Sequence, residues 1–279
     1  MIPRESLLPR RILLQLAVYS ALALMAAIVL FPLLIIASSA FKNDEEIFSW
    51  PLTLIPRHPI FSNFQALMDR FPLYIWNSIK VTAAIVAVQF ITSTTGAYAF
   101  SKLRWRGRDA VFLLYIASIM IPSNSVIIPQ FIIVRSLGLY DTHAALILVS
   151  AFSAFAVFLT RQYFLTIPDS LLEAARIDGA SEFGIFAGII LPLSKPVAVT
   201  VIIFSFRYFW NDFFTPLIYL TSPSLKTLPL GMAEFATEYS VLYGPQMAAA
   251  LISILPVLAI FIIGQRYFVE GVVASGIKG

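Results

Sequence analysis

Long uncharged stretches of apolar residues are the feature that most constrains the fold of this chain. Crossing the roughly 30 Å hydrocarbon core of a bilayer takes about 20 residues of α-helix at about 1.5 Å each, so uncharged windows of that length are decisive. Five such windows occur, at residues 12–41, 81–101, 110–134, 142–160 and 239–265. A sixth, 196–225, is uncharged except for Arg207 and Asp212. The chain is therefore predicted to be an integral membrane protein.

The composition agrees with a chain that consists mainly of spans. Hydrophobic residues make up 59% and charged residues 12% of the 279 residues, and the mean hydropathy is +0.86. Six spans leave too little sequence for a separate soluble domain. We expect an all-α integral membrane protein with a single transmembrane domain over residues 1–279. Its six transmembrane helices are predicted at approximately 12–40, 77–101, 109–134, 143–163, 196–220 and 243–267.

The third predicted span contains signals for an interruption. Pro122, Asn124 and Pro129 lie inside the window 110–134. A proline removes a backbone donor and clashes with the preceding turn of a helix. These residues are expected either to bend one helix or to split it in two.

The positions of Lys and Arg predict the orientation in the membrane. The apolar run after "MIPRESLLPRR" is far longer than the about 7 to 15 residues of a signal-peptide core, so we interpret it as an uncleaved first span. Of the 19 Lys and Arg residues, twelve fall on the side of the termini and six on the opposite side. By the positive-inside rule both termini are predicted to be cytoplasmic. The large outer loops are then residues 42–77 and 221–240.

Several kinds of chemistry are absent from the sequence. The chain has no Cys and only two His, His58 and His143, so zinc, iron–sulfur and cysteine-nucleophile sites are not expected. It also lacks the G-x-x-x-x-G-K-[ST] phosphate-binding loop. The basic residues are spread over the membrane boundaries and form no stripe on one element, which argues against a nucleic-acid partner. We expect no catalytic site, no metal and no cofactor bound by this chain itself.

One charged segment, "LLEAARIDGASEFGIFAGIILPLSKP" at residues 171–196, interrupts the apolar sequence. Ser170 and Glu173 have the spacing of a capping box, and Asp178-Gly179 is a typical helix end, since glycine tolerates a left-handed conformation. A short helix is predicted from Ser170 to Asp178. A second helix is predicted from Ser181 to about Pro192. The segment 168–193 should form a helix, a sharp turn and a helix at the inner membrane surface.

This segment has a purely structural interpretation as well. Glu173 could act as a cap and as the i,i+3 partner of Arg176, in an amphipathic helix that lies on the membrane. Such helices are common in membrane proteins.

A longer pattern in the same segment favours a functional interpretation. Glu173-Ala174-Ala175, three residues, Gly179, nine residues, Ile189, one residue and Leu191-Pro192 resembles the EAA signature of permease subunits of binding-protein-dependent ABC importers. "AYAFSKLRWRG", "RSLGLYDTHAALIL", "FWNDFFTPL" and "GQRYFVEGVVASGIKG" are similar to the second, shorter permease of maltose-type carbohydrate importers. The resemblance covers most of the chain from about Asn77 to Gly279.

The resemblance implies a fold, a function and a set of partners. It implies the type I ABC importer permease fold in a prokaryotic cytoplasmic (inner) membrane. The chain would be the non-catalytic permease subunit of an ATP-driven sugar importer and would form half of the translocation pathway. Its partners would be a sister permease in a heterodimer, two cytoplasmic subunits that bind ATP and Mg, and an extracytoplasmic sugar-binding protein.

The resemblance also implies which residues couple the permease to the ATPase. Glu173 would offer its charge to the ATPase subunit, and Gly179 would make the turn. Phe183 and Phe186 are candidates for an apolar plug, with the alternative that they face lipid headgroups. The candidate coupling residues are Glu173, Ala174, Ala175, Asp178, Gly179, Phe183, Phe186, Leu191 and Pro192.

"FRYFWNDFFTP" in the fifth span is the only place where charge enters the predicted membrane region. At about 100° per residue, Arg207, Trp210, Asn211 and Phe214 share one face, while Asp212 points about 140° from Arg207 unless a break before Pro216 turns it back. A guanidinium, an amide and aromatic rings suit a hydroxyl-rich sugar. Alternatively, Arg207 pairs with a carboxylate of the sister subunit or reaches the membrane surface.

Other polar residues at membrane depth are candidates for the same pathway, although Ser, Thr and amide side chains there can simply bond neighbouring helices. The candidate pathway residues are Gln89, Ser93, Asn124, Arg207, Trp210, Asn211, Asp212 and Phe214.

An ion-coupled secondary transporter or a channel is the alternative function. Such proteins carry ionisable groups in several spans, or paired glycine and proline breaks in matching halves of the chain. Only the fifth span shows these features in the sequence. A membrane enzyme would need a convergent set of acid, base, nucleophile or metal ligands, and none is visible.

Overall fold

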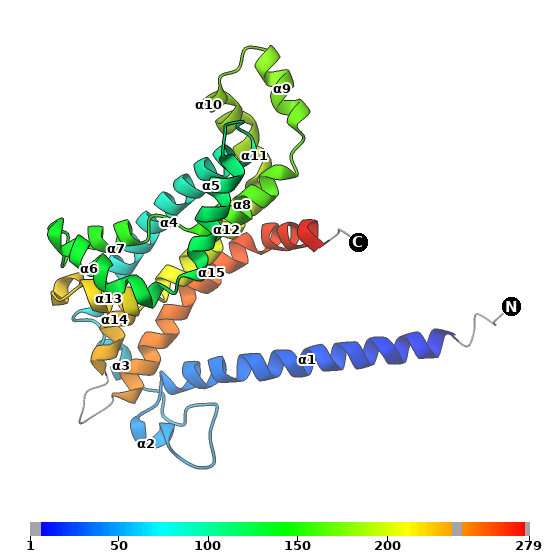
Figure 1. Ribbon diagram of the computed structural model, residues 1–279. Helices are drawn as coiled ribbons and strands as arrows, with labels where there is room; N and C mark the ends of the chain where they lie inside the picture. Colours follow the sequence, from blue (N-terminus) through cyan, green and yellow to red (C-terminus); the bar gives the residue numbers. More distant parts are fainter. Residues whose placement is uncertain (1–6, 236–241, 277–279) are drawn as a thin grey trace. The chain divides into compact units, whose positions relative to one another are not determined.

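The computed structural model describes residues 7–235 and 242–276, and the regular secondary structure in these residues is helical throughout (Figure 1). The long helices are α1 (Leu7–Ser39), α4 (Phe71–Ser101) and α15 (Tyr243–Gly276). The remaining α-helices are α2 (Asp44–Ile47), α3 (Ser62–Gln65), α5 (Arg108–Ala117), α6 (Ile127–Ser136), α7 (His143–Val149), α8 (Ala154–Leu165), α9 (Asp169–Ile177), α10 (Glu182–Ile185), α11 (Leu191–Leu193), α12 (Lys195–Trp210), α13 (Phe214–Tyr219) and α14 (Leu228–Met232). The predicted all-α fold is confirmed.

Three described helices are long and apolar enough to cross a membrane, by length and composition: Ile12–Ser39, Phe71–Ser101 and Tyr243–Gln265. Three bent pairs meet the same criterion together. They are Arg108–Met120 with Asn124–Ser136 (91°), His143–Val149 with Ala154–Leu165 (49°), and Glu182–Leu193 with Lys195–Trp210 (78°). Up to six spans result if each pair counts as one. The boundaries of the predicted spans and the cytoplasmic side of the termini stay predictions, and residues 1–6, 236–241 and 277–279 lie outside the described residues.

The breaks have identifiable local causes. At the first, Ile121 is extended (φ −81°, ψ 115°) because the following proline disfavours the α conformation in the residue before it. At the second, Ser153 is the N-cap of α8, and its Oγ accepts a hydrogen bond from the Ala156 amide at 3.2 Å. The expected split of the third span therefore occurs, and the fourth span is broken as well.

Of the two possibilities for residues 207–214, a regular helix or a break before Pro216, the structure has the break. α12 ends at Trp210, and α13 begins at Phe214. The Asp212 carboxylate accepts hydrogen bonds from the amides of Phe214 (3.0 Å) and Thr215 (3.1 Å), which satisfies the free donors at the start of α13. This cap stabilises the break at residues 211–213, so the helical wheel does not extend across it.

The chain divides into two compact units. The larger unit comprises residues 70–234 with the part of α15 from Ile254 onward. In it α4 is the central helix and packs against α8 and α12. One buried cluster surrounds the C-terminal half of α4 and includes Tyr98, Phe164 and Leu172. A second cluster, around Ile85 and Tyr219, surrounds its N-terminal half.

The smaller unit comprises the described residues up to Asp69 together with Phe235 and 242–253. A buried polar contact organises its loop after α1. The Asn63 amide donates hydrogen bonds to the carbonyls of Ala40 (3.0 Å) and Lys42 (2.8 Å). The Lys42 ammonium group donates to the carbonyl of Thr53. These contacts give the buried ammonium and amide groups the partners that burial requires.

Candidate functional site

The segment that carries the EAA-like pattern lies at one end of the larger unit, and α6, α7 and α13 lie at the other end (Figure 1). α9 begins at Asp169, with Pro168 as its N-cap and no side-chain cap. The predicted capping box of Ser170 and Glu173 is therefore wrong. The reason is tertiary: the Lys102 ammonium binds the Asp169 carboxylate and the Ile167 carbonyl, both at 2.6 Å, and so fixes where the helix starts.

The turn between α9 and α10 has the predicted geometry. Gly179 has a φ of +83°, a region that glycine adopts without the clash a Cβ would make. The Ala180 amide donates to the Ala175 carbonyl (2.9 Å), and the Gly179 amide donates to the Arg176 carbonyl (3.1 Å). This pair of bonds is the Schellman motif. The Asp178-Gly179 helix end is confirmed.

The second helix has approximately its predicted bounds but contains a π-helical turn. Ser181 caps α10, and its Oγ accepts a hydrogen bond from the Gly184 amide at 3.1 Å, as the predicted start requires. The helix continues through a π-helical turn, Phe186–Ile190, and past Pro192 to Leu193. The proline is tolerated because it occupies the first turn of α11. The helix ends at Leu193, in agreement with the predicted end at about Pro192, and the bend comes at Ser194.

The segment has one buried and one exposed side. Leu172, Ile185 and Phe186 are buried in the core around α4, and Phe186 packs on the Tyr98 ring at 5.2 Å between centroids. Ile177 and Phe183 are 86% and 76% exposed. The structure thus separates the two phenylalanines that were expected to act together: Phe183 is accessible and Phe186 is a core residue.

The remaining coupling candidates divide along the same line. Glu173, Ala174, Asp178, Gly179 and Pro192 are exposed, whereas Ala175 and Leu191 are half-buried against the core. Arg176 forms its ion pair with Glu182 at 2.8 Å and not with Glu173, as the purely structural interpretation of the segment would have it. The charge of Glu173 remains at the surface.

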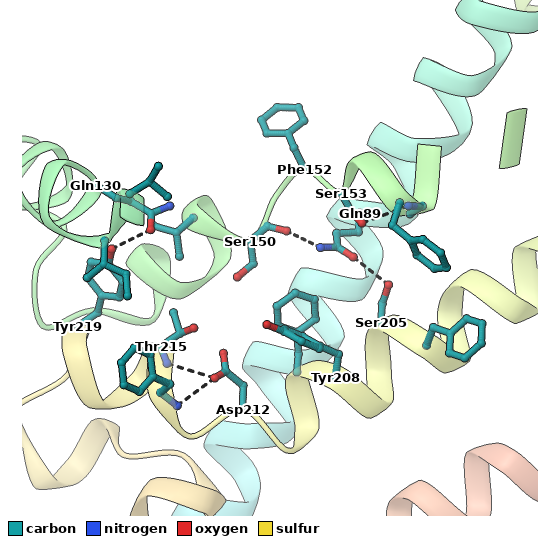
Figure 2. Close-up of a pocket in the computed structure, with 18 of the residues that line it drawn as sticks. Gln89, Gln130, Ser150, Phe152, Ser153, Ser205, Tyr208, Asp212, Thr215 and Tyr219 are labelled. Atoms are coloured by element: carbon teal, nitrogen blue, oxygen red, sulfur yellow. Dashed lines mark hydrogen bonds between the residues drawn. The ribbon is translucent and has the colours of Figure 1, made fainter. Parts of the chain in front are cut away.

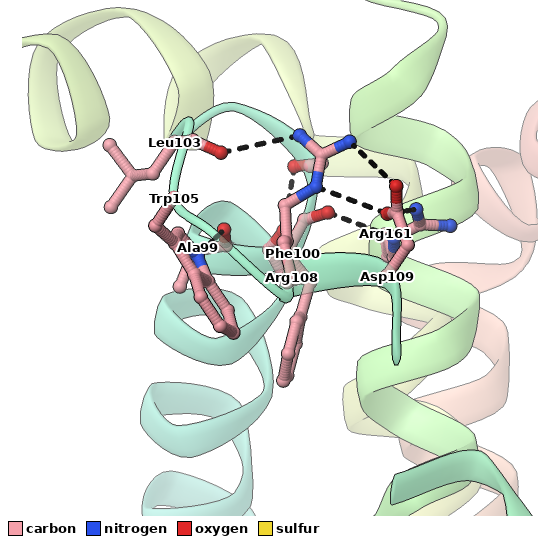
Figure 3. Close-up of polar contacts among 9 residues, drawn as sticks. Ala99, Phe100, Leu103, Trp105, Arg108, Asp109 and Arg161 are labelled. Carbon is pink, nitrogen blue, oxygen red and sulfur yellow. Dashed lines mark hydrogen bonds and ion pairs between the residues drawn. The ribbon is translucent and has the colours of Figure 1, made fainter. Parts of the chain in front are cut away.

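The loop after α4 is fastened to α5 and α8 by a compact set of polar contacts (Figure 3). The Arg161 guanidinium donates to the Phe100 carbonyl (3.0 Å), contacts the Asp109 carboxylate (3.4 Å) and lies 4.1 Å over the Phe112 ring. The Trp105 indole donates to the Ala99 carbonyl at 3.1 Å. These contacts fix the C-terminal end of α4 relative to its neighbours.

A cavity of about 740 Å³ opens in the larger unit. Its walls come from α4, α6, the break between α7 and α8, α12 and α13 (Figure 2). Five of the eight pathway candidates line it, namely Gln89, Asn124, Arg207, Asp212 and Phe214. Ser93, Trp210 and Asn211 do not. Trp210 is 1% exposed and stacks on Phe206, while Ser93 is buried and donates to the Phe90 carbonyl of its own helix.

Gln89 joins three elements at the wall of the cavity (Figure 2). Its Nε2 donates to the Ser150 carbonyl at 2.7 Å, and its Oε1 accepts from the Ser205 hydroxyl at 2.8 Å. Both ends of the amide are therefore used within the protein. Gln89 fixes α4 to the α7–α8 break and to α12 and is a poor donor for a ligand.

Arg207 is the cationic side chain of the cavity. It is exposed, and no ion pair to it occurs among the residues that the structure describes. The break before α13 brings Asp212 to the same cavity, but the two charges form no ion pair. The exposed side-chain amide of Asn211 donates a hydrogen bond to the backbone carbonyl of Arg207 at 2.8 Å.

The sequence did not point to several lining residues. Gln130, Ser150, Ser153, Ser205 and Tyr208 all line the cavity. The serine pair Ser150-x-x-Ser153 in the middle of an uncharged window was a usable signal, because serine favours helix N-caps over helix interiors.

Comparison with known proteins identifies the family of this chain. A family model described as the inner membrane component of binding-protein-dependent transport systems matches residues 90–273. The chain belongs to this family. The permease is 36% identical over 255 residues to the arabinooligosaccharides transport system permease protein AraQ of Halalkalibacterium halodurans, covering 90% of this chain and 91% of the relative. It is 32% identical to the sn-glycerol-3-phosphate transport system permease protein UgpE of Yersinia enterocolitica, covering 88% and 91%.

A solved structure agrees with the family. The permease superimposes on a chain of a bacterial ABC transporter involved in the import of the acidic polysaccharide alginate, with a TM-score of 0.82 and 26% identity, covering 96% of this chain and 99% of that chain. The expected type I ABC importer fold is confirmed, as is the expectation of a non-catalytic permease subunit. The family match therefore favours an ABC permease over the alternative of an ion-coupled carrier or a channel.

Proposed function

We propose that this permease is the transmembrane subunit of an ATP-driven sugar importer and forms half of its translocation pathway. The pathway would be completed by a sister permease, and the sugar would be delivered by an extracytoplasmic binding protein. Two of the similar proteins support a sugar as the substrate. One is a relative named for the transport of arabinooligosaccharides, and the other is a solved transporter structure described as importing alginate. The cavity supports it too, because it combines a guanidinium and amides with the rings of Tyr208 and Phe214.

We further propose that the segment 168–193 couples this permease to a separate cytoplasmic ATPase subunit, one of the two subunits of the importer that bind ATP and Mg. The observation that carries this proposal is the exposed surface of α9 and α10. Ile177, one helical turn from Glu173 in α9, and Phe183 in α10 expose large apolar side chains, while the opposite side of the segment is held in the core. An exposed helical surface with two apolar anchors fits a groove of a partner protein.

The coupling proposal is tested by replacing the apolar anchors. Ile177→Ser and Phe183→Ser should each reduce co-purification of the ATPase subunits and sugar-stimulated ATP hydrolysis. Phe61→Ser is the matched control, since Phe61 is also 65% exposed but lies in the predicted outer loop. Normal assembly and stimulation in both α9 and α10 variants would remove the segment from the ATPase interface.

The pathway proposal is tested at the cavity. Arg207→Ala should impair sugar uptake with assembly and basal ATP hydrolysis retained. Asn211→Ala is the comparison, since Asn211 is a nearby exposed residue outside the cavity wall. Loss of assembly in Arg207→Ala would instead favour a charge pair with the sister subunit.

A further inference from the structure

The C-terminal end of α4 holds the coupling segment at two points. The first is Lys102, which follows the last turn of α4 and whose side chain is 2% exposed. Its ammonium donates to the Ile167 carbonyl and to the Asp169 carboxylate, both at 2.6 Å. This contact fixes the chain immediately before α9 and the first residue of that helix.

The second point is Tyr98, one helical turn earlier in α4. Its hydroxyl donates to Glu182 Oε2 at 2.6 Å, and Arg176 donates to Glu182 Oε1 at 2.8 Å. The Tyr98 ring also packs on Phe186. Glu182 thus joins α4 to both short helices, because it belongs to α10 and its second partner belongs to α9. The hydrogen bonds from Arg176 and Tyr98 lower the pKa of the Glu182 carboxyl, so it is charged at neutral pH.

The covalent connection from the segment to the membrane helices is less direct. Between α10 and α12 the chain passes through the π-helical turn Phe186–Ile190 and then bends by 78° at Ser194. π-helical turns and sharp bends interrupt the regular i→i−4 ladder that makes a helix stiff. A displacement of α9 and α10 is therefore passed along the backbone through two interruptions.

α4 provides an uninterrupted connection to the cavity. It is one regular helix from Phe71 to Ser101. Gln89 lies nine residues before Tyr98, a distance of about 13 Å along the axis at about 1.5 Å per residue. Gln89 is bonded to Ser150 and Ser205, which line the cavity. One rigid helix thus carries the contacts to the coupling segment and to the cavity wall.

We propose that Tyr98 and Lys102 are positioning residues that fasten the coupling segment to α4, so that its movement reaches the cavity through α4 and not through the chain connection to α12. This inference rests on the proposed coupling role of the segment 168–193. It concerns the route by which a movement is transmitted and assigns no contact with sugar or nucleotide to either residue.

The first test removes the Tyr98 hydroxyl alone. Tyr98→Phe keeps the ring on Phe186 and deletes the bond to Glu182. The assembled complex, reconstituted in vesicles, should bind its ATPase subunits normally but hydrolyse more ATP per sugar transported than the wild type, because one contact between the coupling segment and α4 is lost. Tyr115→Phe is the control, since no hydrogen bond of its hydroxyl is found among the described residues. Equal ratios in wild type and Tyr98→Phe would overturn the proposal.

A double variant separates this role from general stabilisation. Glu182→Gln keeps an acceptor for Tyr98 but removes the charge that faces Arg176. If Tyr98 acts through Glu182, the Tyr98→Phe/Glu182→Gln variant should have an ATP-to-sugar ratio no higher than the worse single variant. Additive ratios would show that the two residues act separately and would contradict the transmission route.

Cross-linking gives an answer even if Tyr98→Phe assembles poorly. The chain has no cysteine, so Lys102→Cys/Asp169→Cys introduces the only two thiols. We expect the free double variant to be uncoupled and a short bifunctional thiol reagent to restore the ratio of ATP to sugar. Transport that stops on cross-linking would mean that α4 and α9 must move apart, which refutes the proposal. If the wild-type complex does not bind its ATPase subunits through α9 and α10, the proposed coupling role of the segment 168–193 is refuted, and not only the route through α4.

Discussion

Replacing Lys102 by methionine isolates the energetic role of its ammonium group. Methionine keeps most of the aliphatic stem, so the main loss is the pair of hydrogen bonds to Ile167 and Asp169. The Ile167 residue is 7% exposed, and a buried carbonyl left without a donor costs about 1–3 kcal/mol. The Asp169 side chain is 64% exposed, so solvent screening limits its charge pair to at most about 1 kcal/mol. The variant no longer buries a charged ammonium group, and this gain offsets part of the cost of the lost carbonyl bond and of the lost ion pair.

The buried carbonyl therefore decides the outcome. Lys102→Met should destabilise the permease by about 1–3 kcal/mol. Asp169→Asn, which keeps an acceptor for the ammonium, should cost less than about 1 kcal/mol. Lys80→Met, an exposed lysine on the same helix, is the control and should be close to neutral.

Thermal unfolding of the complex in lipid nanodiscs, followed by tryptophan fluorescence, measures this ranking. The order Lys102→Met, Asp169→Asn, Lys80→Met from the lowest to the highest Tm is expected. If Asp169→Asn lowers the Tm as much as Lys102→Met does, the ion pair and not the carbonyl dominates. If Lys102→Met is neutral, the assignment of a structural clamp to Lys102 is refuted.

Three further predictions follow from the described geometry. Gly179→Val should cost roughly 1–3 kcal/mol through backbone strain at its positive φ, and it should weaken ATPase binding. Gly188→Ala, in open space within the π-helical turn, should have neither effect. Equal ATPase binding in both variants would contradict a role of the turn at Gly179 in ATPase binding. Hydrogen bonds from Ser222 and Thr221 lower the pKa of Asp141 from 3.8 to about 2, so its stabilisation is present above 3.8 and lost as the pH falls toward about 2. The Tm gap between wild type and Asp141→Asn should narrow over that range, and a constant gap would contradict it. A reporter fused after Gly279 should be active as a cytoplasmic reporter, and activity outside the membrane would overturn the predicted orientation.

Some elements follow from residues that act locally. Uncharged windows of about 20 residues predict helices that lipid can surround, whatever the neighbours do. The turn at Asp178-Gly179 forms as predicted because the left-handed conformation depends on the glycine itself. The EAA-like spacing identified the family for the same reason, since it is a property of consecutive residues.

Two differences from prediction arise because a partner distant in the sequence replaces a local one. Ser170 does not cap α9 because Lys102, far away in sequence, fixes the helix start at Asp169. Arg176 does not pair with Glu173 because α10 folds back and presents Glu182. Such competitions depend on which side chains the fold brings together.

The sequence alone determined that this chain is a membrane-embedded helical permease, because hydropathy and the spacing of a short motif are carried by neighbouring residues. The sequence also indicated the break in the third span, but the tertiary structure alone decided which candidate residues share a cavity and which side of α9 and α10 is exposed. The cavity is lined by Gln89, Asn124 and Arg207 from three different elements. Its position depends on the caps at Ser153 and Asp212, whose bonds set the breaks that bring those elements together.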